Sequence, residues 1–465
     1  MSCTRKTLHD HPFNLWKFLL SPTIKAIDVF SLTIKFTLAL CSVASISLIL
    51  YFAFSNYSHF PQPHINTVTN FNQNGSVSIE GREQTTISHI LFGIGGSVKS
   101  WNKRRYYSQL WWKPNVTRGF VWLDKKPSSN MTWPETVPPY KVSEDTSRFK
   151  YSCWYGSRSA VRIARIVKES FELGLPNVRW FVMGDDDTVF FTDNLVSVLV
   201  KYDHNQMYYI GGNSESVEQD VTHSYTMAYG GGGFAISYPL AAELVKILDG
   251  CIDRYDKFYG SDQRIQACLS EIGVPVTKEL GFHQLDIRRS AYGLLAAHPV
   301  APLVSLHHLD YLESIFPNLT RIDSVKKLAS GYEVDPGRIL QHMTAKKLET
   351  AVETFQTWRS WDAGPFTFNT QPVSSDMCER PIIFMLDRVE SVGGGKTLTG
   401  YKRYDMGKEE KDCPKYNYTS ALAVQFFNVS APKFNPDLWN KAPRRQCCEI
   451  INGTDGADNV CLNKL

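Results

Sequence analysis

The sequence carries little net charge and lacks the spaced cysteine pairs that hold zinc. Its 50 Lys and Arg residues stand against 46 Asp and Glu residues, for a net charge of +4, and no basic run is interleaved with aromatic residues. A nucleic-acid-binding surface normally shows a clustered basic excess, so we predict no nucleic-acid partner. The 10 cysteines include no Cys-x-x-Cys pair, which argues against a zinc ribbon.

Charged residues are also missing from one segment near the N-terminus, residues 36–54. As a helix rising about 1.5 Å per residue, this segment would span the roughly 30 Å hydrocarbon layer of a bilayer. Basic residues outnumber acidic ones before it, which keeps the N-terminus in the cytosol. We therefore predict a cytosolic tail at 1–35, a transmembrane signal anchor at 36–54 and a polar stem at 55–84. A cleaved signal peptide is the alternative, but it would have a shorter apolar run followed by a small-residue cleavage site.

Cysteines and glycosylation triplets are concentrated after this segment. Eight of the 10 cysteines follow it, which predicts up to four disulfides in an oxidising compartment. Eight Asn-x-Ser/Thr triplets also follow it. Together with the predicted orientation, they indicate a luminal body on a single-pass type II membrane protein. The short cytosolic tail and the stem favour the Golgi membrane over the endoplasmic reticulum, which is the alternative.

Apolar strand-like runs alternate with amphipathic helical segments in the first part of the body. We expect strands at 87–94, 119–123 and 178–183, and helices at 101–110, 157–173 and 193–201. This alternation predicts an α/β domain over 85–365, with a mostly parallel sheet flanked by helices. Short β-type runs and five cysteines predict a smaller β-rich module over 366–465.

Three successive carboxylates, Asp185, Asp186 and Asp187, directly follow the apolar strand that starts at Val178. Like charges repel at such a strand end, where they are partly desolvated. A hard divalent cation such as Mn²⁺ or Mg²⁺ would offset them and bridge phosphate oxygens. A solvated acidic turn is the alternative, but the apolar residues on both sides of the triplet favour the metal site.

Four glycines, Gly230 to Gly233, precede Phe234. Glycine allows the backbone to approach a ligand closely or to adopt positive φ angles. The run lacks the spacing and the lysine of a phosphate-binding loop. A flexible turn is the alternative to a ligand-binding role.

A carboxylate and three histidines complete the set of candidate residues. Asp262 lies where a helix is expected to start, so it fits either a helix cap or a general base. His283, His307 and His308 follow short apolar runs, and a histidine is a suitable third ligand beside carboxylates. Each of these histidines could instead be a structural hydrogen-bond donor.

From about residue 85 to 320, these motifs resemble the fringe-related β-1,3-glycosyltransferases, most closely the plant fringe-like branch. The motifs that carry the resemblance are, in chain order, Trp180-Phe181, Asp185-Asp186-Asp187, Gly211-Gly212, Gly231-Gly232-Gly233-Phe234, Asp262, Gly273-Val274-Pro275 and Phe282-His283. The resemblance implies a GT-A fold, a UDP-sugar donor, Mn²⁺ (or Mg²⁺) and inversion at the anomeric carbon. The product would be a β-1,3 linkage to a hydroxyl of a glycan or glycoprotein.

The resemblance also implies roles for individual residues. Asp187 would be the main metal ligand, with Asp185 and His283, while His307 and His308 stay open as alternatives to His283. Asp262 falls at the position of the catalytic base. The implied donor-binding residues are Asp185, Asp186, Gly96 and Arg104 or Arg105, and the implied acceptor-binding residues are Gly231, Gly232, Gly233 and Phe234.

Two other classes of protein remain compatible with these residues. A luminal lectin or scaffold would keep the fold and bind glycans without turnover. A metal-dependent phosphoesterase would also use carboxylates and histidine, but it usually needs more ligands than this sequence offers.

Overall fold

The computed structural model describes residues 84–288, 301–338, 382–404 and 424–440 without interruption. Shorter described pieces are 291, 294–295, 342–347, 350–351, 359–360, 447–451 and 457–463, with six single positions between 35 and 45. Within these residues, no helix is both long enough and apolar enough to cross a membrane. The predicted anchor and stem fall almost entirely outside the described residues, so both remain predictions.

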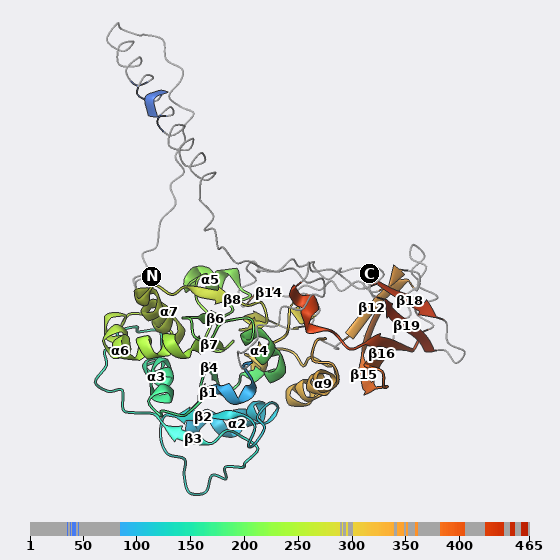
Figure 1. The fold of residues 1–465 in the computed structure, drawn as a ribbon, viewed down its shortest axis with the longest axis horizontal. Coiled ribbons are helices and arrows are strands. Elements are labelled where there is room, and N and C mark those ends of the chain that lie inside the picture. Colours follow the sequence, from blue (N-terminus) through green and yellow to red (C-terminus); the bar gives the residue numbers. More distant parts are fainter. Residues whose placement is uncertain are drawn as a thin grey trace, which may run out of the picture. The chain divides into compact units, whose positions relative to one another are not determined.

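A seven-stranded sheet forms the centre of the first part of the body (Figure 1). Strands β1 to β4 are mutually parallel where they pair, whereas β7 runs antiparallel to both of its neighbours and β6 pairs with β8 in parallel. In spatial order the strands are β3 (Tyr140–Val142), β2 (Arg118–Leu123), β1 (Ile90–Gly95), β4 (Trp180–Asp185), β7 (Phe234–Ser237), β6 (Tyr209–Gly211) and β8 (Val276–Lys278). The predicted mixed α/β architecture with a parallel-rich central sheet is confirmed.

Both faces of this sheet are buried, which explains its nearly continuous apolar strands. Successive side chains of a strand point to opposite faces. Accordingly, Phe92 and Val182 belong to one hydrophobic core, and Leu91 and Phe181 to the other. Helices α3 (Ser159–Phe171), α6 (Tyr238–Arg254) and α7 (Ser261–Ile272) contact one another and contribute to the second core. Helices α2 (Val98–Gln109), α4 (Thr192–Leu199) and α9 (Arg321–Val334) contribute to the first.

The predicted element boundaries differ from the structure by a few residues. Residues Ile87–His89 form a 3-10 turn ahead of β1, so this strand starts at Ile90. Helix α3 matches the predicted helix within two residues at each end. Strand β3 lies inside the predicted loop 125–148. The sequence does not reveal this strand, because its three residues are too few to show an alternating pattern.

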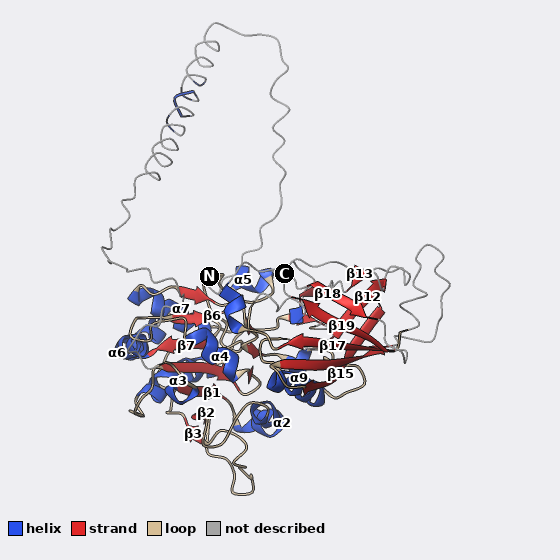
Figure 2. Cartoon of the chain, turned by 45° about the vertical axis from the view of Figure 1, so that its right-hand side comes forward, coloured by secondary structure: helices blue, strands red, loops and turns tan. Residues whose placement is uncertain are grey.

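A second seven-stranded sheet lies in the C-terminal part of the chain (Figure 2). Its first strand, β12, precedes the residue at which composition predicts the β-rich module to begin. In spatial order its strands are β13 (Thr350–Ala351), β12 (His342–Lys347), β15 (Ile382–Ser391), β16 (Lys396–Tyr404), β17 (Phe426–Pro432), β19 (Ala457–Asn463) and β18 (Cys447–Ile451). Arg338 Nη1 donates to the Pro432 carbonyl at 2.6 Å, which links the chain after α9 to β17.

One disulfide is present in the described part of the chain, and it joins α6 to α7 through Cys251 and Cys268. The two residues are 17 apart in the sequence, and both are fully buried. Cys378 and Cys413 fall outside the described residues, so further disulfides stay a prediction.

Replacing both Cys251 and Cys268 with Ala should lower the free energy of unfolding by about 3 kcal/mol. Closing a loop of this length restricts the unfolded chain by roughly that amount. Denaturant unfolding of the variant and of the wild type, both under non-reducing conditions, measures the difference. Equal unfolding midpoints would show that the bridge does not stabilise the helix that carries Asp262.

Candidate active site

The acidic triplet occupies the end of β4, where the central parallel strands terminate. A short turn after Asp185 is held by Thr188, whose backbone N–H donates to the Asp185 carbonyl at 3.0 Å. The Thr188 hydroxyl accepts from the Asp185 N–H at 2.8 Å and donates to the Gly231 carbonyl at 2.7 Å. Strand β5 (Val189–Phe190) follows at once. Thr188, the residue directly after the carboxylates, therefore connects the triplet to the glycine run by hydrogen bonds.

Two carboxylates of the triplet converge with one histidine. His307 Nε2 is 3.1 Å from Asp187 Oδ1 and 3.7 Å from Asp185 Oδ2. One ligand atom from each of Asp185, Asp187 and His307 lies within 4.8 Å of the others. Asp187 is fully buried, whereas the Asp185 side chain is 32% exposed. This arrangement offers two oxygens and one nitrogen around a point that is open on one side.

The chemistry of this cluster fits a divalent cation. Both carboxylate oxygens of Asp187 are buried, and each faces a positively charged group: Oδ1 lies 3.1 Å from His307 Nε2, and Oδ2 lies 3.2 Å from Arg104 Nη2. Carboxylate oxygens and imidazole nitrogen are suitable ligands for Mn²⁺, and a buried carboxylate is costly unless positive charge offsets it. Asp185, Asp187 and His307 would hold the ion.

The electrostatics of the cluster point in the same direction. Burial, followed by the negative charges of Asp187 and Asp186, raises the pKa of Asp185 to about 7. Burial opposes ionisation of Asp187, but the His307 imidazolium and the Arg104 guanidinium hold the pKa of that carboxyl below its usual range. Burial also disfavours the charged form of His307, yet Asp187 raises the pKa of His307 to about 9. A bound cation would displace this proton, because a metal-ligating imidazole nitrogen must be unprotonated.

His307 reaches the triplet through a small three-stranded sheet. Strand β11 (Ser305–Leu306) lies between β5 and β9 (Phe282–His283), and Leu306 pairs with Val189 of β5. The next residue, His307, therefore lies beside the turn that carries the carboxylates. A Cβ atom on Gly231 would lie 2.1 Å from His307 Cε1, so only glycine fits there.

His283, the metal ligand implied by the sequence resemblance, is engaged elsewhere. Its Nδ1 lies 2.8 Å from Glu215 Oε1, and both side chains are 2% exposed. Burial lowers the pKa of His283 to about 3 and raises that of Glu215 to about 8, so the two form a neutral hydrogen-bonded pair. In the described structure the carboxylate cluster contains His307 in the place predicted for His283. His308 instead places its Nδ1 3.0 Å from Asp286 Oδ1.

His307→Ala should weaken Mn²⁺ binding by at least about 100-fold, whereas His283→Gln should leave it within about threefold. Outer-shell partners of a metal typically contribute 10- to 100-fold to affinity, so the loss of a direct ligand costs at least as much. Calorimetric titration with Mn²⁺ measures both affinities, and thermal unfolding checks that each variant folds. Loss of binding in the His283 variant alone would reverse the assignment.

Arg104, on α2, also contacts the triplet. Its Nη1 lies 3.0 Å from Asp186 Oδ1, its Nη2 3.2 Å from Asp187 Oδ2 and its Nε 3.6 Å from Asp310 Oδ2. Ser100 Oγ donates to Asp186 Oδ2 at 2.6 Å. Asp186 is thus bound by α2, whereas Asp187 contacts both Arg104 and His307, and Asp185 faces His307.

Of the two other predicted donor-binding residues, Gly96 lies beside the triplet and Arg105 contacts a different segment. Arg105 Nη1 donates to the Thr132 carbonyl at 3.5 Å, so Arg104 is the arginine that the structure brings to the carboxylates. Gly96 follows β1, and a Cβ there would lie 3.5 Å from Asp186 Cβ. Gly96 is therefore part of the wall beside the triplet.

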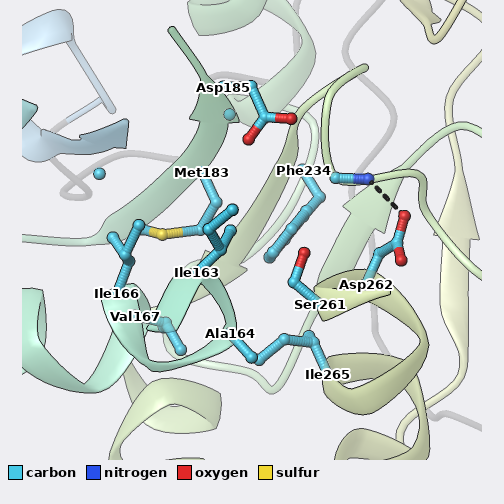
Figure 3. Close-up of a pocket in the computed structure, with 13 residues that line it drawn as sticks. Ile163, Ala164, Ile166, Val167, Met183, Asp185, Phe234, Ser261, Asp262 and Ile265 are labelled. Carbon is cyan, nitrogen blue, oxygen red and sulfur yellow. Dashed lines mark hydrogen bonds between the residues drawn. The ribbon is translucent and has the colours of Figure 1, made fainter. Parts of the chain in front are cut away.

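Asp262 shares a cavity with the end of β4 (Figure 3). Helix α7 is capped by Gly260, and Asp262 is the second residue of its first turn. Its Oδ2 accepts from the Gly230 N–H at 3.2 Å and its Oδ1 from the Gln263 N–H at 2.9 Å. The cavity is lined by Asp185, Phe234 and Asp262, together with apolar side chains of α3 such as Ile163.

The predicted acceptor-binding glycines have contacts within the protein. Gly232 N–H donates to Gln284 Oε1 at 2.7 Å, and the Ser305 hydroxyl donates to the Gly232 carbonyl. Gly233 has a φ of +84°, which favours glycine. The run thus positions His307 and Asp262, and Phe234 is the member of the predicted set that lines the cavity.

The chain shares sequence or structural similarity with a protein family and with solved structures. A family model described as "Protein of unknown function, DUF604" matches residues 219–345 and 341–448. The chain is therefore similar to DUF604 proteins over just under half of its length. That region contains Asp262 and His307 but not the acidic triplet. No curated protein matches the chain.

Among solved structures, one similar chain is described as a glycosyltransferase involved in the glycosylation of the major capsid of PBCV-1. It shares 9% sequence identity, with a TM-score of 0.25, and the likeness covers 41% of this chain and 82% of that chain. A TM-score this low does not establish a common fold.

Proposed function

We propose that this chain is a metal-dependent, inverting glycosyltransferase that moves a sugar from a UDP-sugar to a hydroxyl of a glycan or glycoprotein. One observation carries the proposal: Asp185 of the Asp-Asp-His cluster and Asp262 line the same small cavity of about 20 Å³, so the two carboxylates are neighbours. A carboxylate–histidine cluster can hold a divalent cation, which would bind the diphosphate of the donor, and a separate carboxylate suits a general base. The resemblance to fringe-related enzymes supports the UDP-sugar donor, the GT-A type of fold and the β-1,3 linkage.

The proposed reaction is a single displacement. The acceptor hydroxyl oxygen bonds to the anomeric carbon while its proton passes to the Asp262 carboxylate. The bond between that carbon and the diphosphate oxygen breaks, and UDP leaves with the electron pair, so the configuration inverts. A divalent cation at Asp185, Asp187 and His307 would supply positive charge at the leaving diphosphate. Arg104 already lies beside the same carboxylates and supplies a fixed positive charge there.

We also propose that the body is luminal and is anchored in the Golgi membrane by residues 36–54. The uncharged segment, the basic residues before it and the glycosylation triplets after it support this placement. The Cys251–Cys268 disulfide is compatible with an oxidising compartment.

A donor screen tests the proposed function. The full-length chain, purified from a secretory host, would be incubated with each UDP-sugar in Mn²⁺ or in EDTA. We expect one donor to be cleaved or transferred with Mn²⁺ and none with EDTA. A folded protein that neither cleaves nor binds any UDP-sugar would favour a glycan-binding protein without turnover, and release of free phosphate would indicate a phosphoesterase.

A further inference from the structure

An exposed row of aromatic rings adjoins the helix end that carries Asp262. Trp154 is 81% exposed, Tyr155 51% and Tyr259 43%. Large aromatic side chains are usually well buried, so three neighbouring rings this exposed are unusual. None of the three takes part in the cluster or the cavity described above.

The rings contact one another in sequence. Trp154 meets Tyr155 edge to face, with centroids 5.4 Å apart, and Tyr155 stacks on Tyr259 at 5.6 Å with 14° between the planes. Tyr259 in turn lies 5.5 Å from the His223 ring, which lies 6.3 Å from Tyr229. We call Trp154, Tyr155 and Tyr259 the aromatic row. Through His223 the row continues to Tyr229, the residue directly before Gly230.

The aromatic row leads to the candidate base by two routes. Tyr259 precedes Asp262 by three residues, which limits their Cα atoms to about 11 Å apart. Gln263 Oε1 accepts from the N–H groups of both Tyr259 and Gly260, at 3.0 and 3.2 Å, which draws this segment onto the start of α7. The second route is Gly230, whose N–H donates to Asp262 Oδ2.

Buried and hydrogen-bonded residues support the aromatic row from below the surface. Tyr151 O–H donates to the Tyr259 carbonyl at 3.3 Å, and the Arg264 guanidinium lies 4.9 Å from the centre of the Tyr151 ring. Arg264 is fully buried and donates to the Gly260 carbonyl at 2.8 Å. Ser152 bonds Asp256 through both its N–H and its hydroxyl. Rings supported in this way keep their orientation, as a recognition surface requires.

We propose that Trp154, Tyr155 and Tyr259 form an acceptor subsite that binds a sugar ring of the acceptor glycan by stacking. A sugar ring has apolar C–H faces and a rim of hydroxyls, which suits aromatic faces with polar edges. The continuity of the row with Asp262 favours a ligand that extends from the reacting hydroxyl. That the bound sugar belongs to an acceptor rests on the proposed transferase function. That the row binds a sugar does not rest on it.

The test compares full-length Trp154→Ala with the wild type. Phe426→Ala, which removes another exposed aromatic side chain (42% exposed) from β17, is the control. Binding to an array of immobilised oligosaccharides comes first, and the oligosaccharides that bind then serve as acceptors. Mn²⁺-dependent donor hydrolysis without acceptor is measured in parallel.

Trp154→Ala should raise the KM for the acceptor, or weaken array binding, by about fivefold, because an aromatic stacking contact contributes on the order of 1 kcal/mol. Donor hydrolysis should stay within twofold of the wild type, and Phe426→Ala should behave as the wild type. Array binding that depends on Trp154 in a protein without donor turnover would support the subsite and refute the transferase proposal. Transfer with an unchanged acceptor KM in Trp154→Ala, or a wild type that binds no oligosaccharide, would overturn the subsite.

Discussion

Asp187→Asn should lower metal-dependent donor turnover by at least about 1000-fold. Asp187 is fully buried and contacts His307 and Arg104, the two positively charged groups beside the cluster. The amide keeps the shape of the side chain but removes the charge that would bind the cation. Loss of a single group that stabilises developing charge typically costs 100- to 1000-fold, and loss of the ion removes more than one such interaction.

Turnover of the donor at saturating Mn²⁺ measures this effect, with Mn²⁺ calorimetry alongside it. Asp193→Asn is the matched control, since it makes the same chemical change at an exposed residue in the first turn of α4. Thermal unfolding checks that the buried substitution is tolerated. A folded Asp187→Asn protein that retains turnover within tenfold of the wild type would show that this carboxylate holds no catalytic metal.

Asp262→Asn should slow sugar transfer by about 100- to 10,000-fold, the usual contribution of a general base. An amide oxygen can still accept from the Gly230 N–H, so we expect the glycine run and α7 to stay in place. Mn²⁺ and UDP should bind as in the wild type, because Asp262 is outside the Asp-Asp-His cluster. The kcat for transfer and the calorimetric affinity for UDP separate the two effects.

Glu271→Gln is a matched control for this variant, because it neutralises an exposed carboxylate at the other end of α7. It should leave the kcat for transfer within about twofold. Near-normal transfer by a folded Asp262→Asn protein would mean that another group accepts the proton. Loss of UDP binding in this variant would instead give Asp262 a role in holding the donor.

The central sheet and the triplet were accessible from sequence because each depends on local pattern. Strand β4 is apolar on both faces, so its run ends visibly where the carboxylates begin. Helix α3 shows the apolar periodicity of a helix that covers a sheet. The start of the helix that carries Asp262 could be predicted for a similar reason, since Asp262 lies in its first turn.

Which histidine, His283 or His307, lies beside the carboxylates cannot be predicted from the local sequence pattern. His283 is the last residue of β9, and His307 directly follows β11, a neighbouring strand of the same small sheet. What separates them is tertiary contact: Glu215 binds the first, and Gly231 leaves room for the second. The glycine run was predicted to let backbone approach a ligand, and the structure shows that Gly231 lets backbone approach His307.

The first strand of the second sheet, β12, could not be predicted from the local sequence either. Strand β12 contains His, Thr and two Lys residues, so it lacks the apolar alternation that marks a strand. It forms because it pairs with β15, a partner about forty residues later in the chain. Pairing between distant segments is not visible in a local sequence window.

Crystals soaked with Mn²⁺ and UDP would test the metal assignment most directly. We expect one anomalous peak within coordination distance of Asp185, Asp187 and His307, with the UDP diphosphate beside it. The same soak of Asp187→Asn crystals should give no peak there. A manganese peak beside His283 and Glu215, or UDP bound away from the triplet, would contradict the proposed site.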